Sequence, residues 1–414
     1  MHYWDAYEQA GENEVVTKNP SQSKLVNATK ISGRTQKGLG IGILNAVTKP
    51  QFAIIKNNDG QLRNYRTEAL TNYNVLVLDQ TMKHNSSISL VNTNVMRSGN
   101  DYDANVSAFL FDINDKTNTW NIGGNVSMST LLSNAKNTTG YAHSIYFGKT
   151  SGRFNFTVWQ DLFDDKYDKS DLGYFTNNNT MDQGIWSGYN WTKPTHWYNQ
   201  MRVNADVWFS RLVSPIDILN RKDFMYQSAG ANVNANAQTK KLWWFGINMN
   251  WGARNNDFYE ARNKGRVFQN KGKRSINAWW ESNSAKKLSW GGNIFTGTGS
   301  VFKTKNLNFG LFGKVRFSSK FSVDHTINVQ NSINQPGWAH TFYSGIDVLS
   351  DTIIFSKRDV KGVENIFNVK YSFTNRMGTT LRVRHYWSKV NPLQFLNWIN
   401  TEIYKPHLKP LQKT

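Results

Sequence analysis

Hydrophobic and polar residues alternate with a period of two along most of the chain. The segment WNIGGNVSM (residues 120–128) sets apolar or glycine positions against asparagine, glycine and serine. The segments MRVNADVWF (201–209), ANVNANAQ (231–238) and WFGINMNW (244–251) repeat the pattern. This period puts alternate side chains on opposite faces of an extended strand, whereas an amphipathic helix repeats about every 3.6 residues. The pattern therefore predicts many β-strands, each with one apolar and one polar face, and no amphipathic helix of useful length.

The stretch GRTQKGLGIGILNAVT (residues 33–48) raises the alternative of a nucleotide-binding loop. Its glycines Gly38, Gly40 and Gly42 occupy every second position. The dinucleotide fingerprint G-x-G-x-x-G has a different spacing and needs a helix directly after it. The residues that follow, NAVTKPQFAII, contain a proline and no helical period. We therefore predict a strand whose glycines share the polar face.

Turn signals suggest how the strands are connected. Short polar segments at 57–60, 114–118, 238–241 and 318–320 predict hairpin turns, whereas 161–194 and 253–273 predict long connections. Tight turns at one end and long loops at the other are typical of an antiparallel transmembrane β-barrel of the outer membrane. In such proteins one strand together with its connection takes about 22–26 residues. We therefore expect roughly 14–16 strands in an incomplete barrel. A soluble β-sandwich or propeller is disfavoured, because strands of globular sheets average only ~5–6 residues.

Composition narrows the classes of partner. The chain of 414 residues carries a formal net charge of +20 and no cysteine, which excludes disulfides and thiolate metal sites. Such a charge suggests an anionic partner, namely nucleic acid, acidic lipid or an anionic solute. Because the basic residues are spread over the whole length and no recognition module is visible, we do not expect nucleic acid to be bound.

Five motifs occur together in order along the chain. They are NATKISGRTQKGLGIGILNAVT (27–48), NYNVLVLDQ (72–80), SDLGYFTNNN (170–179), DFYEARNKGRVF (257–268) and KRDVKGVENIFNVKYSFTNRMGTTLRVRHYWS (357–388). They resemble the barrel region of the DUF5916 proteins of Bacteroidetes. The resemblance implies an exported outer-membrane protein in which a domain similar to family 9 carbohydrate-binding modules precedes the barrel. Members of this family are sometimes labelled membrane-associated hydrolases.

The resemblance also sets the expected domain organisation. We expect residues 1–24 to be a lead-in from a missing upstream domain, 25–390 to form the barrel and 391–414 to be an atypical C-terminal tail. The N-terminus has no basic region followed by an apolar one, so no export signal is expected. The chain is therefore interpreted as a fragment or the product of a truncated gene.

No catalytic motif is recognisable, and we expect neither enzymatic activity nor a cofactor. Neither G-x-S-x-G nor H-E-x-x-H occurs, although a pair of carboxylates assembled by the fold stays open as an alternative. A weak candidate for a metal-binding loop comprises Asp161, Asp164, Asp165 and Asp168. It lacks the glycine and the bidentate glutamate of an EF-hand, so a hydrated external loop is the favoured interpretation.

The basic and aromatic residues give more specific candidates. Six basic residues on the polar parity of their strands are candidates for an anion-selective lumen: Arg202, Lys314, Arg316, Lys370, Arg382 and Arg384. Alternatively, they pair with luminal acids such as Asp206 or Asp324 and fill the interior. Five tryptophans are candidates for interfacial belts: Trp120, Trp208, Trp243, Trp251 and Trp387. Five bases in a predicted loop are candidates for binding lipopolysaccharide phosphates: Lys264, Arg266, Lys271, Lys273 and Arg274.

These observations predict a protein of the bacterial outer membrane that contacts lipid and lipopolysaccharide. It would act as a porin-like channel, or as a membrane anchor for a carbohydrate-binding module in glycan use. A membrane-associated hydrolase acting on carbohydrate is the alternative. A soluble all-β binding protein, which would purify without detergent, is a weaker one.

Overall fold

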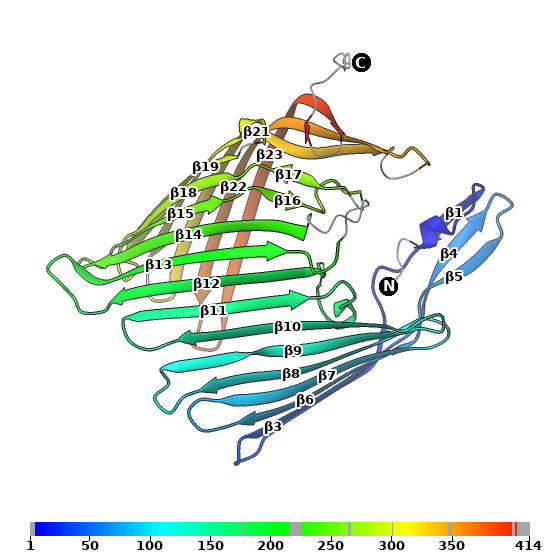
Figure 1. Cartoon of the computed structure of the whole chain (residues 1–414), viewed down its shortest axis with the longest axis horizontal. Coiled ribbons are helices and arrows are strands. Elements are labelled where there is room, and N and C mark those ends of the chain that lie inside the picture. Colours follow the sequence, from blue (N-terminus) through cyan, green and yellow to red (C-terminus); the bar gives the residue numbers. More distant parts are fainter. Residues whose placement is uncertain are drawn as a thin grey trace. The chain divides into compact units, whose positions relative to one another are not determined.

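The computed structural model describes residues 5–175, 177–215, 225–263, 266–299, 301–346, 350–399 and 402–403. The chain divides into two compact units, with residues 1–150 and 159–181 in unit 1 and residues 151–158 and 182–414 in unit 2. Both units consist almost entirely of antiparallel strands, which confirms the all-β prediction (Figure 1). No helix among the described residues is long and apolar enough to cross a membrane.

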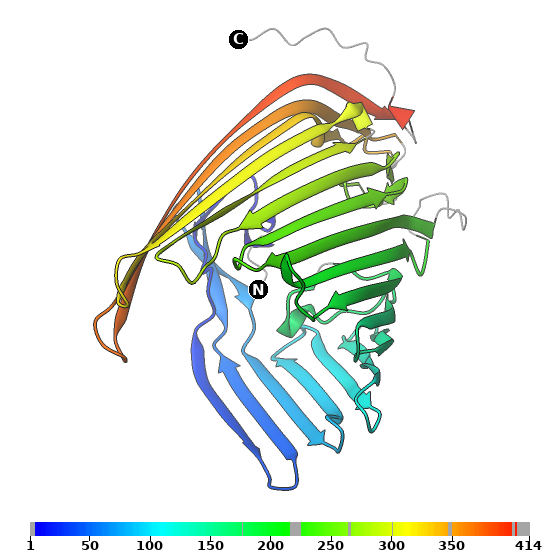
Figure 2. The same cartoon turned by 90° about the vertical axis from the view of Figure 1, so that its left-hand side faces the viewer.

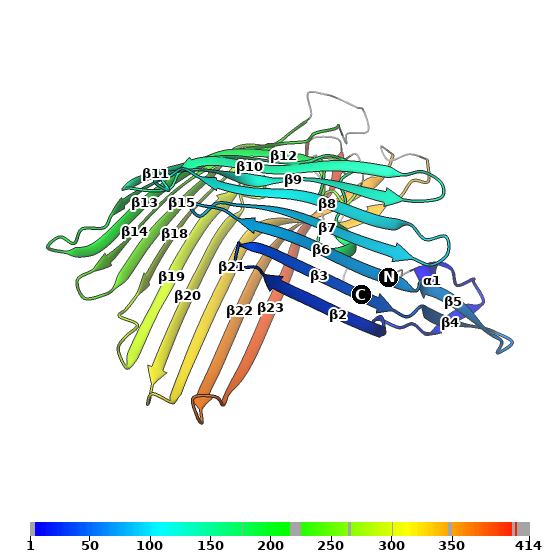
Figure 3. The ribbon, with the colours of Figure 1, turned by 90° about the horizontal axis from the view of Figure 1, so that it is seen from below.

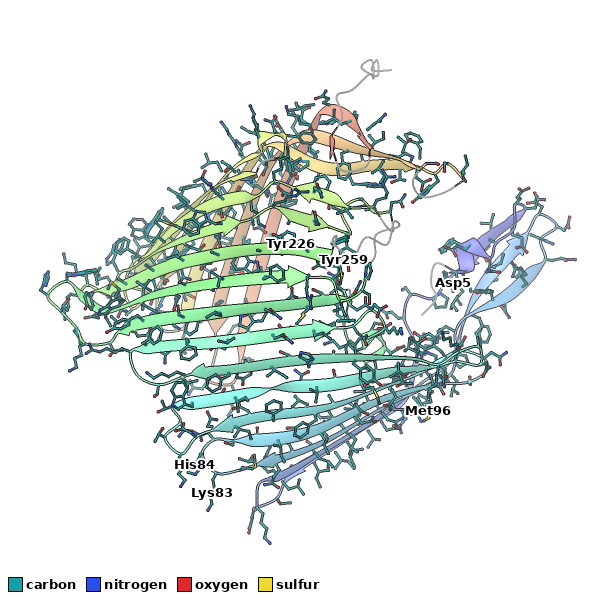
Figure 4. All side chains as sticks on the ribbon, viewed as in Figure 1. Asp5, Lys83, His84, Met96, Tyr226 and Tyr259 are labelled. Atoms are coloured by element: carbon teal, nitrogen blue, oxygen red, sulfur yellow. The ribbon has the colours of Figure 1, made fainter. Side chains whose placement is uncertain are left out.

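The main sheet of unit 1 is a run of antiparallel neighbours. Its strands are β2 (Leu25–Arg34), β3 (Leu39–Thr48), β6 (Thr71–Thr81), β7 (Ser87–Arg97), β8 (Asp103–Asn114), β9 (Trp120–Leu132) and β10 (Thr138–Lys149). Each strand pairs with the next one in this order, and Figure 3 shows them side by side in blue to cyan. The side chains stand on both faces of the strands, with Lys83 and His84 in the turn between β6 and β7 and Met96 towards the far end of β7 (Figure 4). In the glycine-rich stretch 33–48 the strand prediction is confirmed for residues 39–48, which form β3 with Gly40 and Gly42, whereas Gly38 lies in the turn before it (φ 85°).

A second, smaller sheet in unit 1 combines two distant segments. Its strands β1 (Glu14–Lys18), β4 (Gln51–Asn57) and β5 (Leu62–Glu68) are ordered β1-β4-β5, with helix α1 (Asp5–Glu8) beside them. Fully buried Ala6, Ala53 and Ile55 form its core. Residues 51–68 leave the main sheet, and their first strand, β4, pairs with residues 14–18. The expected lead-in (1–24) thus shares this small sheet with part of the segment expected to form the barrel (25–390).

Unit 2 contains the longer run of strands. They are β12 (Thr180–Trp191), β13 (Tyr198–Arg211), β14 (Tyr226–Thr239), β15 (Trp244–Gly252), β18 (Lys273–Glu281), β19 (Leu288–Gly299), β20 (Lys305–Arg316), β21 (Phe321–Phe342), β22 (Thr352–Ser372), β23 (Gly378–Ile399) and β24 (Glu402–Ile403). From β13 onward each strand pairs antiparallel with the next. Strands β21, β22 and β23 are the longest described, at 22, 21 and 22 residues, and Figure 2 shows them in yellow-orange to red. The division between the units falls within β11 (Phe154–Phe163).

The compact apolar core of unit 2 lies among its irregular segments. The hairpin β16 (Asn255–Asp257) and β17 (Phe268–Asn270), the short helix η3 (Val301–Lys303) and the extended ends of β21 and β22 contribute to it. Phe355 is 1% exposed and stacks on Phe268 with ring centroids 4.8 Å apart. Ala261, Val301 and Ile353 complete this cluster. The core therefore depends on side chains that do not belong to the regular alternation.

The main sheets themselves distribute their side chains in the opposite way to a water-soluble sheet. Ile247, Ala278, Ile294, Phe309 and Val329 lie opposite one another on β15, β18, β19, β20 and β21, and they form one row of an apolar face. All but Ala278 are large apolar residues that are substantially exposed. The same is true in unit 1 of Ile41, Ile43, Leu76, Leu90, Ile122, Val126 and Phe147. On the other face, asparagines and serines are half-buried or buried, such as Asn204, Ser210, Asn232 and Ser289. A soluble sheet would instead bury its apolar face.

The predicted connections are confirmed only in part. Hairpin turns occur at all four predicted places, but the expected long connection 161–194 contains β12, and 253–273 contains β16 and β17. Among the described residues, the main sheets of the two units contain nineteen strands (β2–β3, β6–β15 and β18–β24), without the small sheet and the hairpin β16–β17. The expected number of roughly 14–16 is thus too low, because the connections are shorter than the average assumed for such proteins.

The first and last long strands lie in the main sheets of the two units. Strand β2 pairs with β3, and all ten of its residues are exposed. Strand β23 pairs with β22 as far as Trp398, so the sheet includes residues 391–398 of the segment expected to be a tail. The predicted closed transmembrane barrel is not confirmed for the described residues.

Candidate polar-face binding site

The polar face of unit 2 is a network of side-chain amides. Strand alternation places Asn232, Asn234 and Asn236 on one face of β14, and neighbouring strands supply hydrogen-bond partners for this row. Asn204 donates to Asn234 (2.7 Å), Asn234 to Asn232 (2.9 Å), and Asn232 to Asn250 (2.7 Å). Asn250 donates in turn to Ser275 (3.3 Å). Each side-chain amide has two N–H donors and one carbonyl acceptor. The amides of such a row can therefore hydrogen-bond to one another and still have donors and acceptors left for water or a solute.

Several glycines on this face are covered by an aromatic ring from a neighbouring strand. A Cβ atom at Gly230 would collide with the ring of Trp208, and one at Gly246 would collide with that of Trp279. At Gly291 the added atom would lie 2.7 Å from Cε1 of Phe312. Rings placed over strand glycines fill the space that the missing side chain leaves and so restore packing.

Gly310 and Gly362, on the polar face of unit 2, have no ring beside them and lie in a hollow. At Gly362 the atom nearest to an added Cβ is 3.7 Å away, whereas at Gly310 an added Cβ would collide with the side chain of Asn293 (2.4 Å). The resulting pocket has a volume of about 260 Å³. Its polar walls are the side chains of Asn293, Asn308, Asn328, Gln330, Glu364 and Tyr386.

Strand register assembles these walls from segments far apart in sequence. Asn293 lies opposite Gly310, Gly310 opposite Asn328, Asn328 opposite Glu364, and Glu364 opposite Tyr386. One row therefore crosses five strands, from β19 to β23. The adjacent row sets Asn308 opposite Gln330 and Gln330 opposite Gly362.

Charge in the pocket is balanced within it. Glu364 accepts a hydrogen bond from Asn328 (2.9 Å) and forms an ion pair with Arg384 (2.6 Å). The guanidinium of Arg384 also lies 5.9 Å from the ring centroid of Tyr386. In contrast, the buried Oδ1 of Asn308 accepts no hydrogen bond from any described residue. The pocket thus combines a neutralised ion pair with unused amide groups.

Five of the six predicted luminal bases are brought together at one end of β20–β23. Lys314 lies opposite Asp324, Asp324 opposite Asn368, and Asn368 opposite Arg382. Arg316 and Lys370 lie in the next row, where each is opposite Ser322, and Arg384 lies at the pocket. Arg202, on β13, instead donates to Asn204 (2.8 Å) and lies over the ring of Trp186. The other candidate acid, Asp206, lies opposite Asn232.

Four of the five candidate interfacial tryptophans share the parity of the apolar face. Trp120 stacks on Phe147 with ring centroids 5.6 Å apart, and Trp243 packs edge-on against Trp290. Trp251 and Trp387 are exposed on the same parity as Ile247 and Val383. Trp208 differs, because its even position places it on the polar face over Gly230.

The acidic loop uses its carboxylates as local hydrogen-bond acceptors. Asp164 accepts from the backbone amides of Tyr141 (2.8 Å) and Tyr167 (2.7 Å), and Asp168 accepts from Ser170 (2.8 Å). Asp165 binds Asn178 through its carbonyl group, and Asp161 lies on β11. Among the described residues, no group of three or more acidic or histidine side chains converges to hold a metal ion. The geometry therefore gives the weak metal candidate no support.

The loop bases are not uniformly accessible. Arg266 is 4% exposed and donates to the carbonyl of Asp351 (3.3 Å), and its burial lowers its pKa. Lys271 lies in the loop before β18, while Lys273 and Arg274 begin that strand. Lys264 lies outside the described residues.

The comparisons with known proteins support the resemblance drawn from the motifs. A family model described as "Domain of unknown function (DUF5916)" matches residues 2–402. The chain belongs to the DUF5916 family. The match includes residues 14–18, which pair with β4 in the small sheet of this DUF5916 chain.

Other comparisons add little for this DUF5916 chain. No curated protein matches it. Among solved structures, a chain described as "Copper transporter OprC" is similar at 9% sequence identity and a TM-score of 0.43. The similarity covers 89% of this chain and 71% of that chain. A likeness this weak carries no argument about fold or function.

Sequence reasoning did not find the pocket. None of its lining residues was a candidate, although Arg384, the ion-pair partner of Glu364, was one. Gly310, Gly362 and the surrounding amides follow the same alternation as the rest of the polar face. A usable signal is the combination of polar-face glycines with no aromatic residue opposite them, but it requires the strand register.

Proposed function

We propose that this chain is a membrane-embedded β-sheet protein of the bacterial outer membrane whose polar face lines a porin-like passage for water and small solutes. The observation that carries the proposal is the exposure of large apolar side chains at alternate positions of both main sheets. Soluble proteins rarely expose contiguous apolar patches larger than a few hundred Å². A lipid environment removes this apolar surface from water, and outer-membrane strands have the same apolar-out, polar-in alternation.

Two further features support this assignment. Trp120, Trp243, Trp251 and Trp387 share the parity of the apolar face, and membrane interfaces are enriched in tryptophan. The opposite face carries amides and bases rather than a second apolar layer. A soluble all-β binding protein would need another element to cover the apolar faces, as in the layered packing of globular domains.

The bases on β20–β23 suggest that the passage favours anions. Lys314, Lys370 and Arg382 lie in two neighbouring rows of the polar face, with Asp324 among them. Rings of lysine and arginine select anions in pores. We expect stepwise conductance with an anion preference when the detergent-purified chain is added to a planar bilayer. Lys370→Glu/Arg382→Glu should reverse or abolish the preference while conductance persists.

The alternative roles give different results in the same experiment. A chain that inserts into lipid without conducting would contradict the passage and favour a membrane anchor for a carbohydrate-binding domain. A chain that stays in solution without detergent would contradict membrane insertion. The pocket holds one carboxylate, Glu364, whereas glycoside hydrolysis generally uses two, so its geometry does not favour a hydrolase.

A further inference from the structure

The pocket over Gly310 and Gly362 has the features of a built site rather than an irregularity of the sheet. Trp208, Trp279 and Phe312 cover other glycines of the same face, whereas no ring lies over Gly362 and the space above it is open. Side chains that bear amides surround this space, and the amide of Asn293 lies over Gly310. A hollow floored by backbone allows a solute to approach the sheet closely.

The chemistry of the walls favours an uncharged, hydroxyl-rich solute. Side-chain amides offer a donor and an acceptor side by side, and a hydroxyl group is likewise both donor and acceptor. Glu364 is already neutralised by Arg384, so a charged solute would find no unpaired charge of opposite sign in this pair. Tyr386, 59% exposed at the rim, offers an aromatic face to C–H groups.

Size limits the solute further. The volume of about 260 Å³ is smaller than that of pockets for drug-sized ligands, which hold roughly 300–1,000 Å³. A single sugar ring or a short polyol suits such a volume better than an oligosaccharide does.

We propose that this pocket binds a small neutral polyhydroxylated solute, a monosaccharide or polyol, on its way along the polar face. The inference rests on the proposed function, in which this face is in contact with water inside the membrane. Asn328 and Gln330 contribute from β21, Asn308 contributes from β20, and Gly362 sets the depth of the hollow. The ion pair of Glu364 and Arg384 forms one wall and keeps it neutral.

Gly362 provides the test. A Cβ atom there meets its nearest neighbour at 3.7 Å, so Gly362→Val can fill the hollow without a collision at Cβ. Gly313→Val is the matched control, because nothing lies within 4 Å of its added Cβ and the residue belongs to the apolar face of β20. Both variants add the same side chain to a strand glycine.

The experiment is calorimetric titration of the detergent-purified full chain with glucose, and in parallel with glucuronate and glucosamine. We expect wild type and Gly313→Val to bind glucose with the same affinity, Gly362→Val to bind it at least tenfold more weakly, and both charged sugars to bind more weakly than glucose. Absence of glucose binding by the folded wild-type chain would overturn the proposal, as would unchanged binding by Gly362→Val. Equal or tighter binding of either charged sugar would overturn the assignment of a neutral solute.

The readouts separate this proposal from the proposed function. Titration in detergent reports on the pocket alone, whereas bilayer conductance reports on the passage. Folding of each variant is checked by its heat-modifiable mobility on gels, so that loss of binding in a misfolded variant is recognised. If Gly362→Val misfolds, Gln330→Ala replaces it. This substitution removes one side chain of the pocket wall that makes no described hydrogen bond, and it should likewise weaken glucose binding.

Discussion

Ile294→Arg distinguishes a lipid-facing sheet from a water-facing one. Ile294 is 44% exposed in the middle of β19, and it lies between Ala278 and Phe309 in the apolar row. An arginine on the lipid face near the bilayer midplane costs ~2–4 kcal/mol, which lowers the ratio of folded to unfolded protein about 30-fold to 1,000-fold. In water, a substitution at an exposed strand position usually changes stability by only about ±0.5 kcal/mol.

The assay is folding of the urea-denatured chain into lipid vesicles, followed by heat-modifiable mobility and titrated with urea. Leu62→Arg is the control, because Leu62 is 63% exposed in the small sheet of unit 1. We expect a loss of about 2–4 kcal/mol for Ile294→Arg and less than about 0.5 kcal/mol for Leu62→Arg. Equal, small effects of both substitutions would refute the lipid-facing assignment of the apolar row.

Two further predictions concern the small sheet of unit 1 and the apolar cluster around Phe355 in unit 2. The ion pair with Arg63 and a hydrogen bond from the backbone N–H of Gly11 lower the pKa of Glu14 from 4.5 to about 2. The stability that these two interactions contribute to the small sheet should therefore be complete above pH 4.5 and disappear as the pH falls towards 2. Limited proteolysis across this range should show the loss in wild type and not in Glu14→Gln, and a pH-independent wild type would contradict it. Phe355→Ala should destabilise unit 2 by ~3–5 kcal/mol because it empties the contact with Phe268. A change in urea midpoint equivalent to less than about 1 kcal/mol would show that this cluster is not a core.

The strands were predictable because alternation is a local property of the sequence. Residues 120–128 and 231–238 form parts of β9 and β14 as the pattern indicated. Strand β12 was missed because its alternation is weak: Gln183 and Ser187 interrupt the parity of Ile185, while Trp186 lies on the polar face beneath Arg202.

Long-range pairing was not predictable from the same pattern. Strands β4 and β5 alternate like their neighbours, and nothing local shows that their partner is β1. The polar parity of the basic residues on β20–β23 was readable, but their arrangement in rows depends on three registers. The pocket depends on the same registers, since Gly310 and Gly362 come from strands that are not adjacent.

The central claim is that successive residues of each main-sheet strand face lipid and water in turn. The chain contains no cysteine, so single cysteines can be introduced and spin-labelled without altering a native thiol. Ile294 and Phe309 lie on the apolar face, and their neighbours Asn293 and Asn308 lie on the polar face of the same strands. The decisive measurement is the accessibility of labels at these four positions, in the chain reconstituted into vesicles, to oxygen and to a water-soluble nickel chelate. The account predicts that labels at 294 and 309 are relaxed mainly by oxygen, and labels at 293 and 308 mainly by the chelate. Equal accessibility of neighbouring positions to the chelate would contradict it.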